Sequence, residues 1–112
     1  MRLYINNTEV PVVWEYYAPA EDLKNILPLS LHMYNDQRSA QVSTLPRSVI
    51  YSDQWITTVP GDVLLYEGDK LVIMYDGRRG YYTQLGRIEC PCQQILELIG
   101  RGDAEVRLVP RG

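Results

Sequence analysis

Several residue types are scarce in this chain, and each scarcity excludes a class of site. The 112 residues include a single histidine, His32, and two cysteines, Cys90 and Cys92. One histidine cannot form a histidine pair on a metal ion, and two cysteines are too few for the disulfide framework of a small secreted domain. We therefore expect no metal site and no cofactor.

Long apolar runs are also absent. No run approaches the roughly 18 residues that a membrane-spanning helix needs, and the N-terminal segment lacks the apolar region of a signal peptide. Basic and acidic residues are nearly balanced, with 11 lysines and arginines against 14 aspartates and glutamates and a net charge of -3. This balance gives no electrostatic reason for binding nucleic acid or an anionic membrane. We predict a cytoplasmic protein with neither of these partners.

Phenylalanine is missing altogether, whereas nine tyrosines and two tryptophans are present. A tyrosine has an apolar ring and a hydroxyl group that needs a partner, so we expect many of them at the edge of the core or along a groove. The length of the chain allows burial of roughly two-thirds of its unfolded surface, which is enough for one core. We predict a single domain over residues 1–112.

Most of the chain shows the short apolar or alternating segments that are typical of β-strands. The expected strands are 3–5, 10–14, 29–34, 39–43, 63–66, 71–75, 81–88 and 104–108. Asn6-Asn7-Thr8 predicts a hairpin turn, because asparagine tolerates positive φ angles. The continuous apolarity of 63–66 and 71–75 predicts strands with one face in the barrel and the other beneath a helix.

Two short helices are expected between the strands. Pro19 favours a helix start and Pro28 ends that helix after Leu27. Pro91 starts the second helix, with Ile95, Leu96, Leu98 and Ile99 on its apolar face, and Gly100 supplies a left-handed residue that closes it. About eight strands and two capping helices predict a mainly β fold, a closed antiparallel barrel, because closure removes exposed edges. The segment 44–60 is either a functional loop or a further strand.

The order of these elements resembles a known family. An apolar hairpin is followed by Leu85-Gly86-Arg87-Ile88, a helix and a closing strand, and cyclophilins have a similar hydrophobic-Gly-basic-hydrophobic segment at this point. The stretches 26–31 and Leu45-Pro46-Arg47-Ser48 are similar to the small bacterial and archaeal cyclophilin-like proteins. The resemblance covers most of the chain and implies a closed cyclophilin-like β-barrel.

The resemblance also implies an activity to be tested, because true cyclophilins are peptidyl-prolyl isomerases. Such a site needs an arginine that hydrogen-bonds the prolyl nitrogen within an apolar pocket. Arg47 is the residue that matches this catalytic arginine. The phenylalanines are absent, Leu71 stands where the isomerases have a glutamine, and 76–84 lacks the tryptophan and histidine. Most of the isomerase residues therefore lack a match.

Sequence reasoning leads to three functional hypotheses. The first is a non-catalytic or weakly catalytic binding module for a peptide or small molecule, and its groove is expected to include Arg47 and the ligand-binding residues Tyr51, Gln54, Trp55, Tyr75 and His32. The alternatives are a divergent prolyl isomerase and a homo-oligomeric assembly protein, for example a homodimer. Trp55 is equally explained as a lid on the barrel, and His32 as a surface residue opposite Leu31 and Met33.

Two short motifs have simple structural interpretations. Cys90-Pro91-Cys92 could bind a soft metal or act as a redox pair at a helix N-terminus. A capped helix start with small buried thiols explains the same residues, and we favour it. Arg101-Gly102-Asp103 matches an adhesion tripeptide, but a turn after the second helix explains it better.

Overall fold

The computed structural model describes residues 1–111, which form ten β-strands and two α-helices. The strands are β1 (Arg2–Ile5), β2 (Thr8–Val10), β3 (Val12–Trp14), β4 (Leu29–Asn35), β5 (Ala40–Thr44), β6 (Gln54–Thr57), β7 (Asp62–Tyr66), β8 (Lys70–Met74), β9 (Arg79–Ile88) and β10 (Ala104–Val109). The helices are α1 (Ala18–Lys24) and α2 (Cys92–Ile99). The fold is mainly β, as the sequence predicts.

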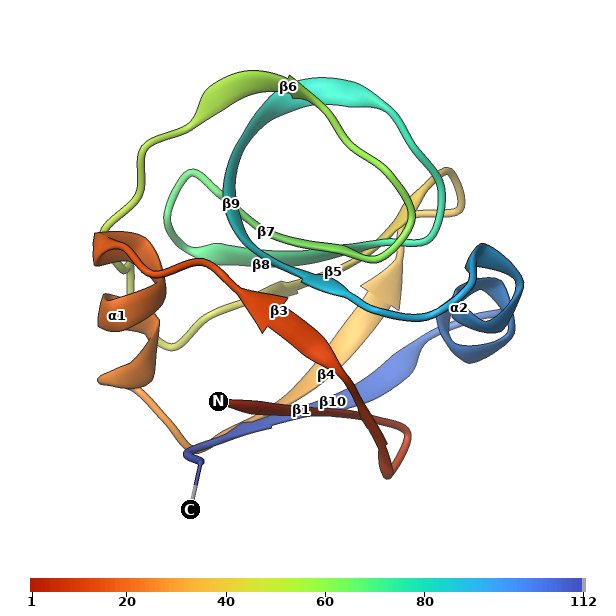
Figure 1. Cartoon of the computed structure of the whole chain (residues 1–112), viewed down its shortest axis with the longest axis horizontal. Helices are drawn as coiled ribbons and strands as arrows, with labels where there is room; N and C mark the ends of the chain where they lie inside the picture. Colours follow the sequence, from red (N-terminus) through yellow and green to blue (C-terminus); the bar gives the residue numbers. More distant parts are fainter. Residues whose placement is uncertain (112) are drawn as a thin grey trace.

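The strands form a nearly closed antiparallel barrel (Figure 1). Their order around it is β2-β1-β10-β4-β5-β8-β7-β9-β3, with β6 off this path and paired with β9. Only Pro11 separates β2, which pairs with β1, from β3, which pairs with β9. The nine strands of the path, with β2 and β3 counted as one interrupted strand, therefore make a ring of eight. The predicted antiparallel barrel of about eight strands is confirmed.

The barrel has two hydrophobic cores, one on each face of its central strands. The main core fills the interior and includes Val63 and Ile73, whereas Leu64 and Val72 belong to a second core on the outer face. Alternation along β7 and β8 separates these pairs, since neighbouring residues of a strand point to opposite faces. The prediction that a helix covers this outer face is wrong. Ile56 of β6 packs against the second core instead.

The two helices lie at opposite sides of the barrel (Figure 1). Ala20 and Leu23 of α1 and Ile95 and Ile99 of α2 are buried in the main core. Both predicted helices are correct in position, and the end of the first one is wrong. The first ends at Lys24, one turn before Pro28.

The second helix differs from its prediction in two details. Gly100 is right-handed, with a φ of -85°, and the positive φ of this turn, 94°, belongs to Gly102. The predicted left-handed closure was therefore placed two residues too early. Leu96 is 41% exposed rather than part of the buried face.

Two open questions about the loops are resolved. Asn6 and Asn7 have φ angles of 50° and 68°, so the first hairpin turns where the sequence predicts. The segment 44–60 contains strand β6, which makes the second of the two alternatives correct. Neither helix of the described chain has the length and apolarity to cross a membrane.

Candidate functional site: a groove beside the first helix

Arg47 lies on the loop after β5, where α1 fixes its side chain. Its guanidinium donates to both carboxylate oxygens of Asp22, at 3.3 and 3.5 Å, and to the backbone oxygen of Ser48 at 2.8 Å. The hydrogen bond from Arg47 is the main cause that lowers the pKa of Asp22 to about 2, with smaller contributions from Ile50 and Asn25. Arg47 therefore joins a loop to a helix end, and its catalytic role stays a prediction.

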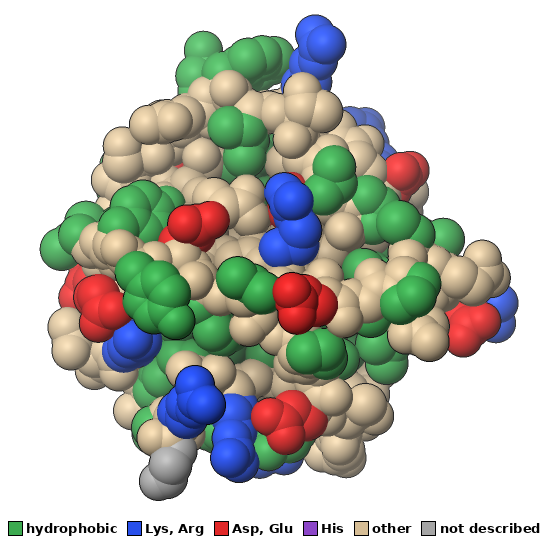
Figure 2. Space-filling view, in the orientation of Figure 1, with side chains coloured by type: hydrophobic (Ala, Val, Ile, Leu, Met, Phe, Trp, Pro, Cys, Tyr) green, Lys and Arg blue, Asp and Glu red, His purple; other side chains and the backbone are tan. Residues whose placement is uncertain are grey.

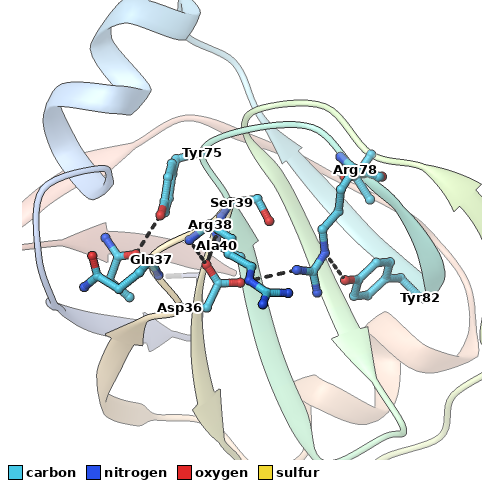
Figure 3. A network of polar contacts seen from close by, with 10 residues as sticks. Asp36, Gln37, Arg38, Ser39, Ala40, Tyr75, Arg78 and Tyr82 are labelled. Atoms are coloured by element: carbon cyan, nitrogen blue, oxygen red, sulfur yellow. Dashed lines mark hydrogen bonds and ion pairs between the residues drawn. The ribbon is translucent and has the colours of Figure 1, made fainter.

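The other predicted groove residues are dispersed over the molecule. Tyr75 is 9% exposed, and its hydroxyl donates to Asn35 at 2.6 Å, on the side of the barrel shown in Figure 3. Tyr51 lies over Gly68, where a Cβ atom would come within 2.3 Å of the tyrosine ring. Trp55 is 59% exposed and packs edge-on against Tyr81 at 5.0 Å. Trp55 is thus an outward-facing residue of the β6–β9 pair.

His32 lies on the outer surface of β4, as alternation predicts. Its ring contacts two carboxylates of the β10 region, Asp103 at 3.2 Å and Glu105. The hydrogen bond to Glu105 and then that to Asp103 raise the pKa of His32 above its ordinary value. The His32 side chain therefore links β4 to the β10 region.

Of the predicted residues, only Gln54 lines the groove that we describe as the candidate site. This α1–β9 groove has a volume of about 620 Å³ and lies between the start of α1, the loop before β6, and strands β6 and β9. The lining residues used below are Tyr17, Ile50, Gln54, Ile56, Gln84 and Arg87. The lining of the groove thus combines apolar and polar side chains.

A buried carboxylate fixes the polar side chains of the groove. The side chain of Asp62 is 1% exposed, and its Oδ1 accepts from Arg87 Nε at 2.7 Å and from Gln84 Nε2 at 3.2 Å. Asp62 Oδ2 accepts from the backbone N–H of Val59 at 2.9 Å. Because both carboxylate oxygens are occupied, Arg87 and Gln84 are held in one orientation.

The remaining donors and acceptors of this cluster belong to side chains that line the groove. Gln84 Nε2 also donates to the Gly86 carbonyl at 2.6 Å, so the Oε1 of Gln84 is left as an acceptor. Within residues 1–111, the two terminal nitrogens of the Arg87 guanidinium have no hydrogen-bond partner, and this side chain is 57% exposed. The site therefore offers a charged donor beside a neutral acceptor.

Tyr82 also lines the groove, and residues outside the lining fix its hydroxyl. Its hydroxyl accepts from Arg78 Nε at 2.8 Å, and Arg78 Nη1 lies 3.5 Å from the carboxylate of Asp36 (Figure 3). Asp36 itself accepts from the backbone N–H groups of residues 38–40. The turn between β4 and β5 is thereby connected to the groove.

A larger pocket, of about 800 Å³, lies beside β2 and β3 and is bordered by Met1 and Arg111. Every charged side chain that lines it is exposed, and Arg2 lies 3.9 Å from Glu9. Figure 2 shows acidic and basic side chains scattered among hydrophobic ones on the face that it displays. Since no buried group fixes the charges of this pocket, the α1–β9 groove is the better candidate.

Metal and redox chemistry find little support at the cysteines. No group of three potential metal ligands occurs in the part of the chain that the structure describes. Cys90 and Cys92 are free thiols, and burial raises the pKa of the Cys90 thiol. A raised pKa disfavours the thiolate form of Cys90, which opposes the activation expected at a helix N-terminus.

Comparison with known proteins gives one match. The model of a family described as the cyclophilin-like family matches residues 3–109. No curated protein and no solved structure matches the chain.

Proposed function

Because this chain belongs to the cyclophilin-like family, we propose that it is a binding domain that takes up a peptide or a small molecule in the α1–β9 groove. One observation carries the proposal: Gln84 and Arg87 are fixed by the buried Asp62 while their outer donors and acceptor lack partners in residues 1–111. Side chains that are held in place before binding lose little entropy when a ligand arrives.

The chemistry of the groove favours a ligand with an amide group. An amide presents a carbonyl acceptor next to an N–H donor, which complements the Arg87 donors and the Gln84 Oε1 acceptor. Gln54 adds a second side-chain amide, and Ile50 and Ile56 add apolar surface for alkyl groups. Small-ligand sites commonly combine apolar walls with a few polar groups in this way.

Prolyl isomerisation, the alternative from the resemblance, is less well supported. It requires an arginine that can reach the prolyl nitrogen inside a water-excluding pocket. Arg47 is engaged by Asp22 and Ser48 and lies outside the lining of the groove. Binding without efficient catalysis is therefore the function that we propose.

An NMR fragment titration tests this proposal. The probes are small N-acetylated amino-acid amides with alkyl side chains, added to uniformly labelled protein. We expect the side-chain signals of Gln54, Gln84 and Arg87 to shift together, and Arg87→Ala to weaken binding about tenfold or more. Arg101→Ala, at an exposed turn outside the groove, is the matched control.

A second variant distinguishes loss of binding from misfolding, because Arg87→Ala leaves the buried Asp62 without its cation. Gln54→Ala removes an exposed groove amide that has no hydrogen bond to residues 1–111, and it should also weaken binding. The proposal fails if the probes leave the groove signals unchanged. It also fails if the wild type accelerates prolyl isomerisation in a peptide assay and Arg47→Ala does not.

A further inference from the structure

Strand β6 has one edge that no other strand covers. β9 is its only strand partner within residues 1–111, through the pairs from Gln54↔Tyr82 to Thr57↔Arg79. Figure 1 shows β6 at the rim of the molecule, away from α2. Half of the backbone N–H and C=O groups of an edge strand point outward, so this edge can accept another strand.

This edge lacks the features that usually protect an exposed strand. Such strands often carry lysine or proline, contain a β-bulge or lie beneath a loop. Gln54–Thr57 has no charged residue and no proline, and its pairing with β9 is regular. Gln54, Trp55 and Thr57 are exposed, and Tyr81 beside Trp55 is 59% exposed. Tryptophan and tyrosine are enriched where proteins contact one another.

The charges at the two ends of β6 have opposite signs. At its N-terminal end, Asp53 Oδ2 accepts from the backbone N–H of Glu67 at 2.9 Å, so two acidic residues lie together. At its C-terminal end, Arg79 pairs with Thr57, and it forms no ion pair within residues 1–111. The neighbouring Arg78 is already engaged by Asp36 and Tyr82 (Figure 3). Arg79 is therefore a cation available to a partner.

An antiparallel arrangement brings the N-terminal end of one strand to the C-terminal end of the other. Two copies of this chain, paired along their β6 edges, would place the Asp53–Glu67 end of each copy beside Thr57 of its partner, one strand away from the Arg79 that pairs with this Thr57. This match is self-complementary, as a twofold interface requires. A peptide from another protein would match this edge only if it carried an acidic and a basic residue in the same order.

We propose that β6 is a homodimer interface in which two copies pair antiparallel through their free edges. The sheet then continues from β9 and β6 of one copy into β6 and β9 of the other, with acidic and basic residues at each end. This interface uses the outer edge of β6, a strand that also lines the α1–β9 groove through Gln54, Ile56 and Thr57. Because a four-residue edge is a small interface, we expect a dissociation constant on the order of 100 μM.

Sedimentation velocity over a range of protein concentrations tests the interface. The mass should rise from 12.9 kDa for one chain towards twice that value, and the association should weaken at high salt. A chain that stays monomeric up to about 1 mM, ten times the expected dissociation constant, overturns the proposal.

Charge reversal identifies the surface and the orientation. Arg79→Glu makes both ends of the edge acidic. Glu67→Arg replaces an acidic side chain by a basic one, so the two ends no longer carry opposite charges. Each variant alone should therefore dimerise about tenfold more weakly. A mixture of the two variants should form heterodimers, and the double variant should regain the wild-type association. Both residues are exposed, and Arg101→Glu is the matched control.

Two outcomes contradict this orientation. Dimers that persist unchanged in both single variants show that another surface associates. Single variants that weaken the dimer without rescue in the mixture show that the charges do not meet across the interface. Fluorescence of Trp55 in a Trp14→Phe background gives an independent readout, because the exposed indole should become less accessible to a quencher on dimerisation.

Discussion

At the scale of single residues, Asp22 links charge to stability. The Arg47 side chain and the Ile50 backbone N–H hydrogen-bond its carboxylate, and its pKa is lowered to about 2. The folded-state pKa of Asp22 lies below the ordinary aspartate value of about 3.9, so the ionised carboxylate stabilises the fold above about pH 3.9. This contribution is lost as the pH falls through about 2. We expect Arg47→Ala to raise the pKa of Asp22 towards the ordinary value, as measured by a carboxyl-carbon NMR titration.

The control for this prediction is Arg101→Ala, which should leave the Asp22 titration unchanged. The Arg47→Ala variant should also unfold at a higher pH than the wild type during acid titration, because Asp22 then protonates earlier. If the pKa of Asp22 stays near 2 without Arg47, the ion pair is not its main cause.

Single-residue roles were only partly predictable from the sequence. Alternation places His32 outside the barrel, but its partners Asp103 and Glu105 lie on a segment 71 and 73 residues away. Arg87 belongs to the Leu85–Ile88 segment that carries the family resemblance, and the sequence does not mark it as a site residue. Its role depends on Asp62, 25 residues earlier on another strand. Cross-strand contacts of this kind follow from register, which composition and periodicity do not reveal.

At the scale of elements, Gly86 permits the closure of the barrel between β3 and β9. A Cβ atom at this position would lie 2.7 Å from the Val13 carbonyl oxygen and 3.0 Å from the Trp14 ring. Because the first contact is with backbone, Gly86→Ala must push the two strands apart. We expect a loss of about 1–3 kcal/mol in the free energy of unfolding, measured by urea denaturation.

The matched control lies on the same strand pair. Val13 is 54% exposed, so Val13→Ala should change the free energy of unfolding by no more than about 0.5 kcal/mol. If Gly86→Ala is as stable as the wild type, the strands tolerate a wider separation than the structure indicates.

Elements with a strong local pattern were predicted well, and the exception has a physical cause. The hairpin turn at Asn6 and Asn7 and the apolar strands β7 and β8 are specified by neighbouring residues. The short β6 is largely exposed and lies between two prolines in 44–60. Its strand conformation comes from pairing with β9 and from the contact of Ile56 with the second core. Such tertiary contacts leave little periodicity in the sequence.

At the scale of the whole molecule, the tendency of strands to pair until no strand edge is exposed explains most of the topology. It does not explain β6. The interrupted strand of β2 and β3 closes the ring, as the sequence argument for a barrel requires. The same argument did not foresee β6, which adds an edge outside the ring. The two cores share strands, since Val63 and Leu64 are neighbours on β7 but pack on opposite faces. Loss of either core should therefore disrupt the other.

This sharing predicts cooperative unfolding, which the two tryptophans can report separately. Trp14 lies on β3, where its Nε1 donates to the Met1 carbonyl at 3.1 Å, and Trp55 lies on β6. In dilute protein, single-tryptophan variants made by Trp14→Phe and Trp55→Phe should unfold in urea with midpoints that coincide with far-ultraviolet circular dichroism. A Trp55 transition at lower urea would show that β6 and the second core unfold before the barrel. In that case the main core would be stable by itself, and the shared strands would not couple the two.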